Sequence, residues 1–255
     1  MKIVVCVKYV PASESSLEII DDGRGFKAEP MVINETDEYA LEEAFAIKKK
    51  FGGEVTVITA GTVRTSEVLY YGLAKGADRA VRVDTESNDP KVISKLIAEA
   101  IKKLRYDLIL TGIESADNLS AQVGVRVAEK LGIPSLLMVV SIEVVKESQT
   151  IRLSKEIGGG VREIAELPLP ALLGIQSGIR PLSYVTLRKK MLARSRSVTT
   201  LTLKDLSLDE KVLLEKSLEF DRYSFPEVTR RAEIIKGEPA EAVKTLLQKI
   251  GRVLA

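Results

Sequence analysis

The residues best placed to do chemistry lie between Thr111 and Gly124, and their pattern suits binding of a phosphate. This segment follows the apolar run Leu108 to Leu110, and Val125 to Leu131 behind it has helical spacing. A glycine directly after a buried strand, followed by small polar residues at a helix start, presents backbone N–H groups to phosphate oxygens in α/β sheets. The sequence therefore predicts a phosphate-binding loop here.

Composition narrows the chemistry that protein side chains could perform. The 255 residues include no histidine and a single cysteine, Cys6. Ser-His-Asp and Cys-His nucleophile pairs and histidine-containing zinc sites are therefore excluded. Carboxylates and lysines are present, but no pair stands out from the ordinary solvated faces of helices. We expect no catalytic side chain and no metal site, so any redox chemistry must come from a bound cofactor.

Charge and hydropathy restrict the environment and the partners. The 38 basic and 36 acidic side chains leave a net charge of +2, which gives no general argument for binding nucleic acid or an anionic membrane. One cysteine favours a reducing compartment. No apolar run reaches the roughly 20 residues that span a bilayer, and the chain opens on a strand pattern instead of a signal peptide. We expect a soluble, cytoplasmic protein without membrane insertion.

Strand and helix patterns alternate through the first half of the chain. A parallel sheet with right-handed crossovers and helices on both faces follows from that alternation, which makes this a doubly wound, Rossmann-like α/β fold. Its ligand crevice should lie at the carboxyl ends of the strands. The expected strands are Lys2–Val10, Glu54–Ala60, Arg79–Val83 and Asp107–Thr111; a short hairpin surrounds Asp21–Gly25; the helices follow Asn34 to about Lys50, Val63–Lys75, 89–104 and the stretch up to Leu131.

The second half is organised differently. From Ser135 the pattern predicts an antiparallel extension, and a final core strand follows. Residues 176–197 are rich in basic side chains and form an exposed loop in this interpretation. We expect a nucleotide-binding α/β domain over residues 1–199 and a C-terminal arm over 200–255 that ends in an amphipathic helix. The strands concerned are Val139–Lys146, Thr150–Glu156, Val161–Glu166 and Ala171–Ile175, and the last helix is Pro239–Val253.

Several short motifs, in order and spacing, resemble those of the beta subunit of electron transfer flavoprotein. The resemblance covers the chain to about residue 205 and is weaker beyond it. Its marks are Ile3–Val10, Val32–Asn34, Asp37–Glu38, Ala40–Ala44, Gly76–Arg79, Asp107–Gly112, Gln122 with Gly124, Gly158–Gly160 and Leu167–Ala171.

The resemblance implies a heterodimer with an alpha subunit that holds most of a redox FAD. Electrons would come from an acyl-CoA dehydrogenase or a related flavin dehydrogenase, as in fatty acid oxidation, and would pass to a quinone oxidoreductase. The C-terminal arm would wrap the alpha subunit. The chain would thus be an electron carrier subunit, with a nucleotide in its own sheet crevice.

The residues with which family members contact that nucleotide correspond to specific positions in this sequence. Small residues at Cys6 and Ala60 would let a nucleotide approach the strand ends, although small core residues look the same in sequence. Asn34 is equally a plain helix cap, and polar loop residues often only solvate a turn. The expected cofactor-binding residues are Cys6, Asn34, Glu35, Thr36, Asp37, Ala60, Leu108, Thr111, Gly112, Ile113, Glu114, Ser115, Asp117, Asn118, Ser120, Ala121, Gln122 and Val123.

The occupant of this pocket differs between two branches of the family. Ordinary members hold AMP and carry Asn-Gln-Thr at the positions of Ala121 to Val123. Electron-bifurcating members, which use NADH, hold a second FAD and look like Ala-Gln-Val-Gly at these positions. This chain has the same four residues from Ala121 to Gly124. The sequence therefore favours a second FAD over AMP.

The basic segment 176–197 resembles the recognition loop with which the family docks on its dehydrogenase. The anchoring leucine corresponds to Leu187, flanked by Tyr184 and Met191. An apolar anchor with a polar rim suits a protein partner. RNA is not expected, because the basic run has no interleaved aromatic platform.

A different class of function shares the same sheet architecture. Nucleotide-binding stress proteins use it as sensor modules without redox function, and fold alone does not separate the two. A sensor would be a colourless homodimer, whereas the flavoprotein subunit would copurify with an alpha subunit and be yellow. Adenylate-forming enzymes need a Ser-Gly-Gly-Xaa-Asp-Ser loop after the first strand, and residues 11–15 do not have it.

Overall fold

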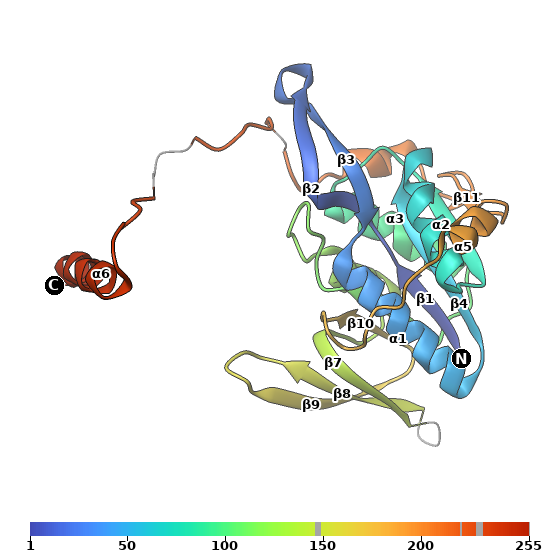
Figure 1. Cartoon of the computed structure of the whole chain (residues 1–255). Helices are drawn as coiled ribbons and strands as arrows, with labels where there is room; N and C mark the ends of the chain where they lie inside the picture. Colours follow the sequence, from blue (N-terminus) through green and yellow to red (C-terminus); the bar gives the residue numbers. More distant parts are fainter. Residues whose placement is uncertain (146–148, 220, 228–231, 255) are drawn as a thin grey trace.

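A computed structural model describes residues 1–145, 149–219, 221–227 and 232–254. Its centre is a nine-stranded sheet in the order β11-β5-β4-β1-β6-β10-β7-β8-β9. The pairs from β11 to β7 are parallel, and β8 and β9 add an antiparallel extension (Figure 1). The strands are β1 Lys2–Cys6, β4 Glu54–Gly61, β5 Arg79–Asp84, β6 Leu108–Gly112, β7 Ser135–Val145, β8 Thr150–Glu156, β9 Arg162–Pro168, β10 Ala171–Ile175 and β11 Thr199–Leu201.

Helices cover both faces of the sheet, as the alternating pattern predicts. Alternate residues of the central strands are buried on opposite sides, and each side has its own aliphatic cluster. Helices α1 Glu35–Phe51 and α2 Ser66–Lys75 cover one cluster, while α3 Pro90–Lys102 and α4 Val123–Leu131 cover the other. The predicted doubly wound, mostly parallel α/β fold is confirmed.

The first strand and the hairpin differ from their expected form. One strand was expected over residues 2–10, but β1 ends at Cys6 because the chain turns at Val7 and Lys8 and begins a new strand at Tyr9. The hairpin is also much longer than the short turn expected around residues 21–25. It pairs β2 Tyr9–Ile20 with β3 Gly25–Ile33 and has a register shift between Pro11 and Ser16, where the sequence pattern indicated that the chain leaves the strand.

Strand β7 also departs from the expected pattern, because it pairs in both senses. The expectation was an antiparallel strand over 139–146, whose last residue lies outside the described ones. Ser135 to Val139 instead run parallel to β10, and the rest of β7 runs antiparallel to β8. One strand thus connects the parallel sheet to its antiparallel extension.

The chain after residue 176 returns to the body before it departs. Helix α5 Leu187–Ala193 lies beside α2, and β11 pairs parallel with β5 at the sheet edge (Figure 1). Leu206 and Val212 are buried in the cluster on the α3 side, so packing continues past residue 199. The last helix, α6 Pro239–Leu254, stands away from the sheet and exposes apolar side chains.

The aliphatic cluster beneath α3 should contribute strongly to stability. Leu96 is fully buried there, whereas Leu214 is 81% exposed. We expect Leu96→Ala to lower the free energy of unfolding by about 2–5 kcal/mol, because it removes apolar burial and leaves a cavity. The matched control Leu214→Ala should change it by less than about 0.5 kcal/mol. Urea denaturation measures both, and equal losses would contradict this assignment of the core.

Candidate functional site

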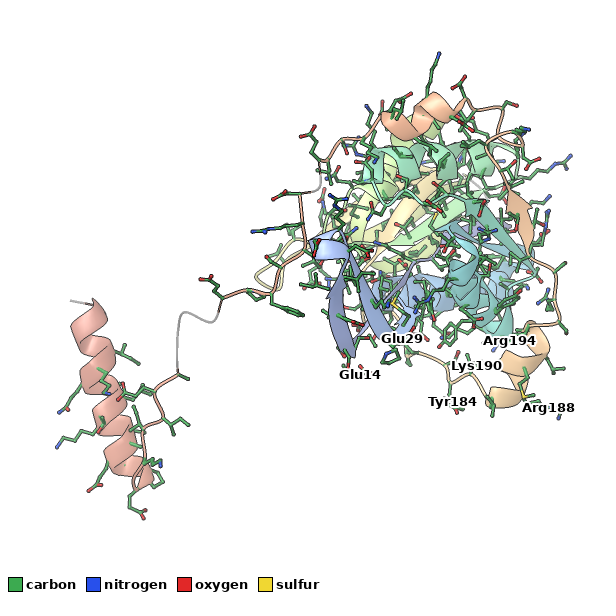
Figure 2. All side chains as sticks on the ribbon, turned by 90° about the horizontal axis from the view of Figure 1, so that it is seen from above. Glu14, Glu29, Tyr184, Arg188, Lys190 and Arg194 are labelled. Carbon is green, nitrogen blue, oxygen red and sulfur yellow. The ribbon has the colours of Figure 1, made fainter. Side chains whose placement is uncertain are left out.

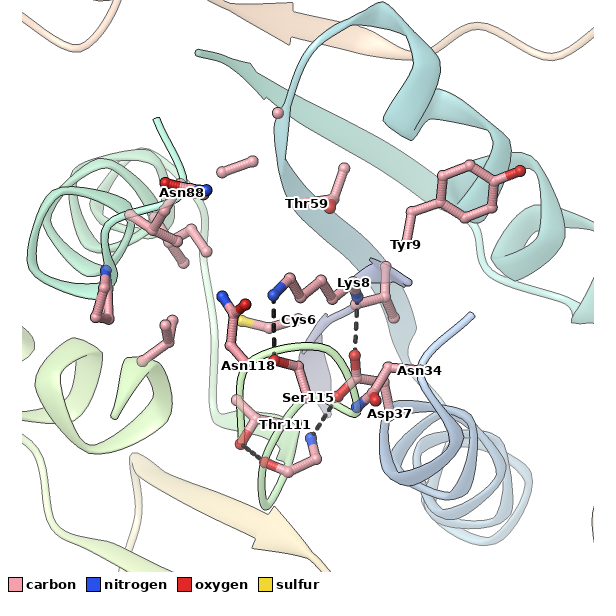
Figure 3. Close-up of a pocket in the computed structure, with 18 of the residues that line it drawn as sticks. Cys6, Lys8, Tyr9, Asn34, Asp37, Thr59, Asn88, Thr111, Ser115 and Asn118 are labelled. Atoms are coloured by element: carbon pink, nitrogen blue, oxygen red, sulfur yellow. Dashed lines mark hydrogen bonds between the residues drawn. The ribbon is translucent and has the colours of Figure 1, made fainter. Parts of the chain in front are cut away.

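A cavity of about 320 Å³ opens at the carboxyl ends of the central strands. From β1 the chain proceeds outward through β4 and β5, and then crosses back to place β6 on the other side of β1. The cavity thus lies at the point where strand order reverses, which is where open α/β sheets bind ligands. Its wall includes the ends of β1, β4 and β6 and the loop after β5 (Figure 3).

Most of the residues expected to bind a cofactor line this cavity. The shared feature is that they follow the carboxyl end of β1, β4 or β6, or stand at the start of α1. They are Cys6, Asn34, Asp37, Ala60, Thr111, Gly112, Ile113, Glu114, Ser115, Asn118, Ser120, Ala121, Gln122 and Val123.

Four expected residues do not line the cavity. Leu108 begins β6 at the opposite end of the sheet, where it pairs with Ile3 and is fully buried in the core. Glu35 is exposed at the start of α1. Thr36 and Asp117 contact neighbouring loops instead of the cavity, and those contacts hold the wall in place.

Asp37 joins the two loops that meet across the switch point. Its Oδ2 accepts a hydrogen bond from the backbone N–H of Lys8 at 2.8 Å, and its Oδ1 accepts one from Gly112 at 2.9 Å. Burial raises the pKa of this carboxyl to about 7, although the two backbone hydrogen bonds oppose the shift. One side chain therefore fixes both the loop after β1 and the end of β6.

Asn34 has a different role from the helix cap that its position suggests. No side-chain capping bond forms at α1. Its Nδ2 instead donates to Glu114 O at 2.8 Å, and its Oδ1 accepts from Ala116 N at 3.0 Å. Thr36 Oγ1 also donates to Glu114 O, at 3.0 Å. The start of α1 thus holds the loop after β6 by its backbone.

Lys8 is a cavity residue that the sequence reasoning missed. Its Nζ donates to Ser115 Oγ at 3.1 Å (Figure 3) and also pairs with Asp117 Oδ1 at 2.7 Å. The ammonium group therefore ties the first half of the β6–α4 loop to the turn that follows β1. A lysine after the first strand was the available signal, but nothing in the sequence indicated its partners about 107 residues away.

The β6–α4 loop follows a tightly determined path. A Cβ at Gly112 would overlap the side chains of Thr36 and Asp37, so only glycine fits this close approach. Leu119 and Ala121 both have φ near 50°, a left-handed conformation that non-glycine residues seldom adopt. Such conformations persist where surrounding structure imposes them and are frequent at ligand sites.

The opposite wall is formed by the β5–α3 loop, which the sequence analysis also missed. Residues 85–88 line the cavity, and Asp89 caps α3 by accepting from Lys91 N at 2.8 Å. The Asp89-Pro90 pair at a helix start was the signal that could have located this turn. Hydroxyl and amide groups gather on this side and on the turn after β4, while Pro90, Ile93 and Ile97 add an apolar patch.

Cys6 contributes shape instead of reactivity. Its thiol is buried at the end of β1, and burial raises its pKa to about 12, with a further contribution from the charge of Asp37. The thiol is therefore protonated at neutral pH and is a poor nucleophile. A small side chain here leaves space in the cavity.

The segment expected to dock a partner lies outside this cavity. A loop was expected, but residues 187–193 form helix α5, begun by a hydrogen bond from Lys189 N to Thr186 Oγ1 at 3.4 Å. Tyr184, Leu187 and Met191 are 85%, 70% and 66% exposed. Figure 2 places Tyr184 at the outer rim of the molecule. Leu187 and Met191 are thus one helical turn apart on α5, and all three expected docking residues are exposed.

The raised pKa of Asp37 makes a pH-dependent contribution to stability. Its ordinary pKa is 3.8 and its folded value is about 7, so the folded chain binds more protons between these values. Stability from this group is therefore greatest at low pH and falls as pH rises towards 7. We expect the unfolding free energy of the natural chain, minus that of Asp37→Asn, to fall between pH 5 and pH 8. A constant difference in urea denaturation would contradict the raised pKa.

Comparisons with known proteins agree in family and extent. A family model described as the electron transfer flavoprotein domain matches residues 27–206. Electron transfer flavoprotein subunit beta of Methylophilus methylotrophus is 33% identical over 258 residues, covering 98% of both chains. The corresponding subunit of Clostridium acetobutylicum is 33% identical and also covers 98% of both. That of Bacillus subtilis is 33% identical over 90% of this chain and 88% of its own.

These relatives match along nearly the whole chain, including the cavity and α5. The structure adds the doubly wound sheet and a cavity at its switch point. The chain therefore belongs to the electron transfer flavoprotein family, as one of its beta subunits.

Proposed function

We propose that this chain pairs with an alpha subunit and carries electrons through bound FAD from a flavin dehydrogenase, of the acyl-CoA type or related, to a quinone oxidoreductase. The family assignment supports the electron transfer role and the alpha-subunit partner. Among the described residues no helix is long and apolar enough to cross a membrane. The single buried cysteine favours a reducing compartment, and we place the heterodimer in the cytoplasm.

The observation that carries the proposal is the cavity at the switch point. Its lining fits an adenine nucleotide, because an apolar patch suited to a ring faces a loop of backbone N–H groups and small polar side chains. Pro90, Ile93 and Ile97 would contact the base, and Ser120 to Val123 would face the phosphates at the start of α4. Asp37, Asn34 and Lys8 would hold these loops in place before the nucleotide arrives.

We propose that the occupant of this cavity is a second FAD. Ala121 and Val123 line the cavity with small apolar side chains where AMP-binding members carry Asn and Thr, and Gly124 follows without adding bulk. FAD would supply one-electron and two-electron redox chemistry there, as in electron-bifurcating relatives that use NADH. This chain would bind the cofactor, orient it and shield it from water.

Cofactor stoichiometry tests this proposal. We expect the purified heterodimer to be yellow and to release two FAD and no AMP on denaturation, measured by absorbance and chromatography. The double variant Ala121→Asn with Val123→Thr should lower the FAD content towards one. One FAD plus one AMP would contradict the second flavin. A colourless homodimer would contradict the flavoprotein role and favour a nucleotide sensor.

The exposed surface on α5 gives a second test. We propose that Tyr184, Leu187 and Met191 contact the dehydrogenase, because an exposed apolar cluster beside basic side chains suits a protein interface. Leu187→Ala should raise KM for the dehydrogenase about tenfold or more, since it removes a central apolar anchor. Flavin content should stay unchanged, because α5 lies outside the cavity. The control Leu214→Ala removes an equally exposed leucine elsewhere, and equal KM values for both variants would reject the assignment.

A further inference from the structure

The segment of residues 180–196, which includes α5, is fastened to the body of the protein at several points. Arg180 pairs with Glu43 of α1, and its Nη2 lies 3.2 Å from Glu43 Oε1. Arg194 Nη2 lies 2.6 Å from Glu67 Oε2 of α2. Arg196 donates to the carbonyl oxygens of residues 77 and 78 at 2.8 and 2.6 Å. These contacts lie on both sides of α5, so both of its ends are restrained.

A buried charge cluster on α1 and α2 lies under the segment. The Lys75 side chain is 0% exposed, and its Nζ lies 2.7 Å from Glu38 Oε1 and also pairs with Glu42. Tyr71 donates its hydroxyl to Glu38 at 2.6 Å. Helices α1 and α2 are therefore joined by one buried cation shared between two carboxylates.

The segment completes this cluster. Glu42 Oε1 accepts from the backbone N–H of Ser183 at 2.7 Å and from its hydroxyl at 2.6 Å. Burial alone would raise the pKa of Glu42, but the hydrogen bonds from Lys75 and Ser183 hold it below its ordinary value. The pKa of Arg180 is raised, first by its hydrogen bond to Glu43. The segment thus supplies donors that the carboxylates of α1 need.

Charge balance explains why the segment has one preferred position. Glu38, Glu42 and Glu43 carry three negative charges in this cluster and Lys75 supplies one positive charge, so two negative charges in the cluster have no compensating cation from α1 or α2. Glu43 is 1% exposed, and a buried carboxylate without a partner is strongly destabilising. Only the segment supplies a cation to Glu43 among the ion pairs of the described residues, which favours the fastened position over any other.

The fastened position decides which side of α5 faces outward. Lys190 Nζ lies 5.4 Å from the centre of the Tyr71 ring, and Ala193 is buried against the body. Leu187 and Met191 are left exposed, and so is Arg188, which Figure 2 places at the outer edge of the segment. Tyr71 thus donates its hydroxyl to Glu38 and also receives Lys190 of α5 over its ring.

We propose that Glu42 and Glu43 of α1, with their partners Arg180 and Ser183, are positioning residues that hold the surface of Tyr184, Leu187 and Met191 ready for docking. This inference rests on the proposed docking function of α5. A surface held in its bound conformation loses less entropy on association, so affinity rises without any new contact. The basic side chains around the apolar cluster indicate the partner's chemistry, which is an apolar socket rimmed by carboxylates.

The test weakens the attachment of the segment to α1 without substituting any residue of α1 or α2. The variant Arg180→Gln with Ser183→Ala removes the cation at Glu43 and one donor to Glu42. In the complete heterodimer we expect amide hydrogen exchange of residues 184–193 to become about tenfold faster, and KM for the dehydrogenase to rise about tenfold with kcat unchanged. Arg180→Lys keeps the charge and should restore most of both values. Arg162→Gln, on the exposed strand β9, is the control and should change neither.

The outcomes separate this inference from the function on which it rests. Unchanged exchange in residues 184–193 would overturn the positioning role. Faster exchange with unchanged KM would also overturn it, provided that Leu187→Ala raises KM in the same assay. If Leu187→Ala leaves KM unchanged as well, the docking function itself has failed. A loss of kcat with normal KM would place Arg180 in a step after docking and would overturn the inference too.

Discussion

The cavity depends on one buried carboxylate that accepts two backbone hydrogen bonds. Asp37 reaches from α1 to Lys8 N on one side of the switch point and to Gly112 N on the other. A parallel sheet leaves a crevice between these strand ends, but nothing in the sheet itself fixes the loops that border it. Without this acceptor, two N–H groups at the mouth of the cavity would have to find other partners. Burial of this carboxylate is unfavourable for its charged form, and its pKa is raised for that reason.

Helix α1 positions two separate parts of the molecule. Asn34, just before the helix, and Asp37, in its first turn, fix the loops of the cavity. The following turns carry Glu42 and Glu43, which receive the segment that bears α5. Between them runs the apolar stripe that anchors the helix on the sheet. One packed helix therefore positions both the cavity and the proposed docking surface.

The sequence was most informative where structure is local. Alternating strands and helices predicted the sheet, and a glycine after a buried strand predicted the loop from Thr111 to Gly124, which lines the cavity. Side-chain roles were harder, because their partners are distant: Asn34 looked like a helix cap, yet it binds the backbone of a loop 80 residues away. Leu108 was included with its loop although it begins the strand at the far end of the sheet. Helix α5 is short, and its packing against α2 through Ala193 is a tertiary effect that periodicity does not reveal.

Because α1 positions two parts of the molecule, the spacing of residues along it is constrained in evolution. Each residue of an α-helix adds about 100° of rotation and 1.5 Å of length. A one-residue insertion or deletion between Asp37 and Glu42 would leave both ends helical, but it would turn one group of carboxylates away from its partners. Point substitutions can be repaired locally, whereas such a length change breaks one site or the other. The spacing inside α1 should therefore vary far less among descendants of this chain than the lengths of the hairpin and of the arm.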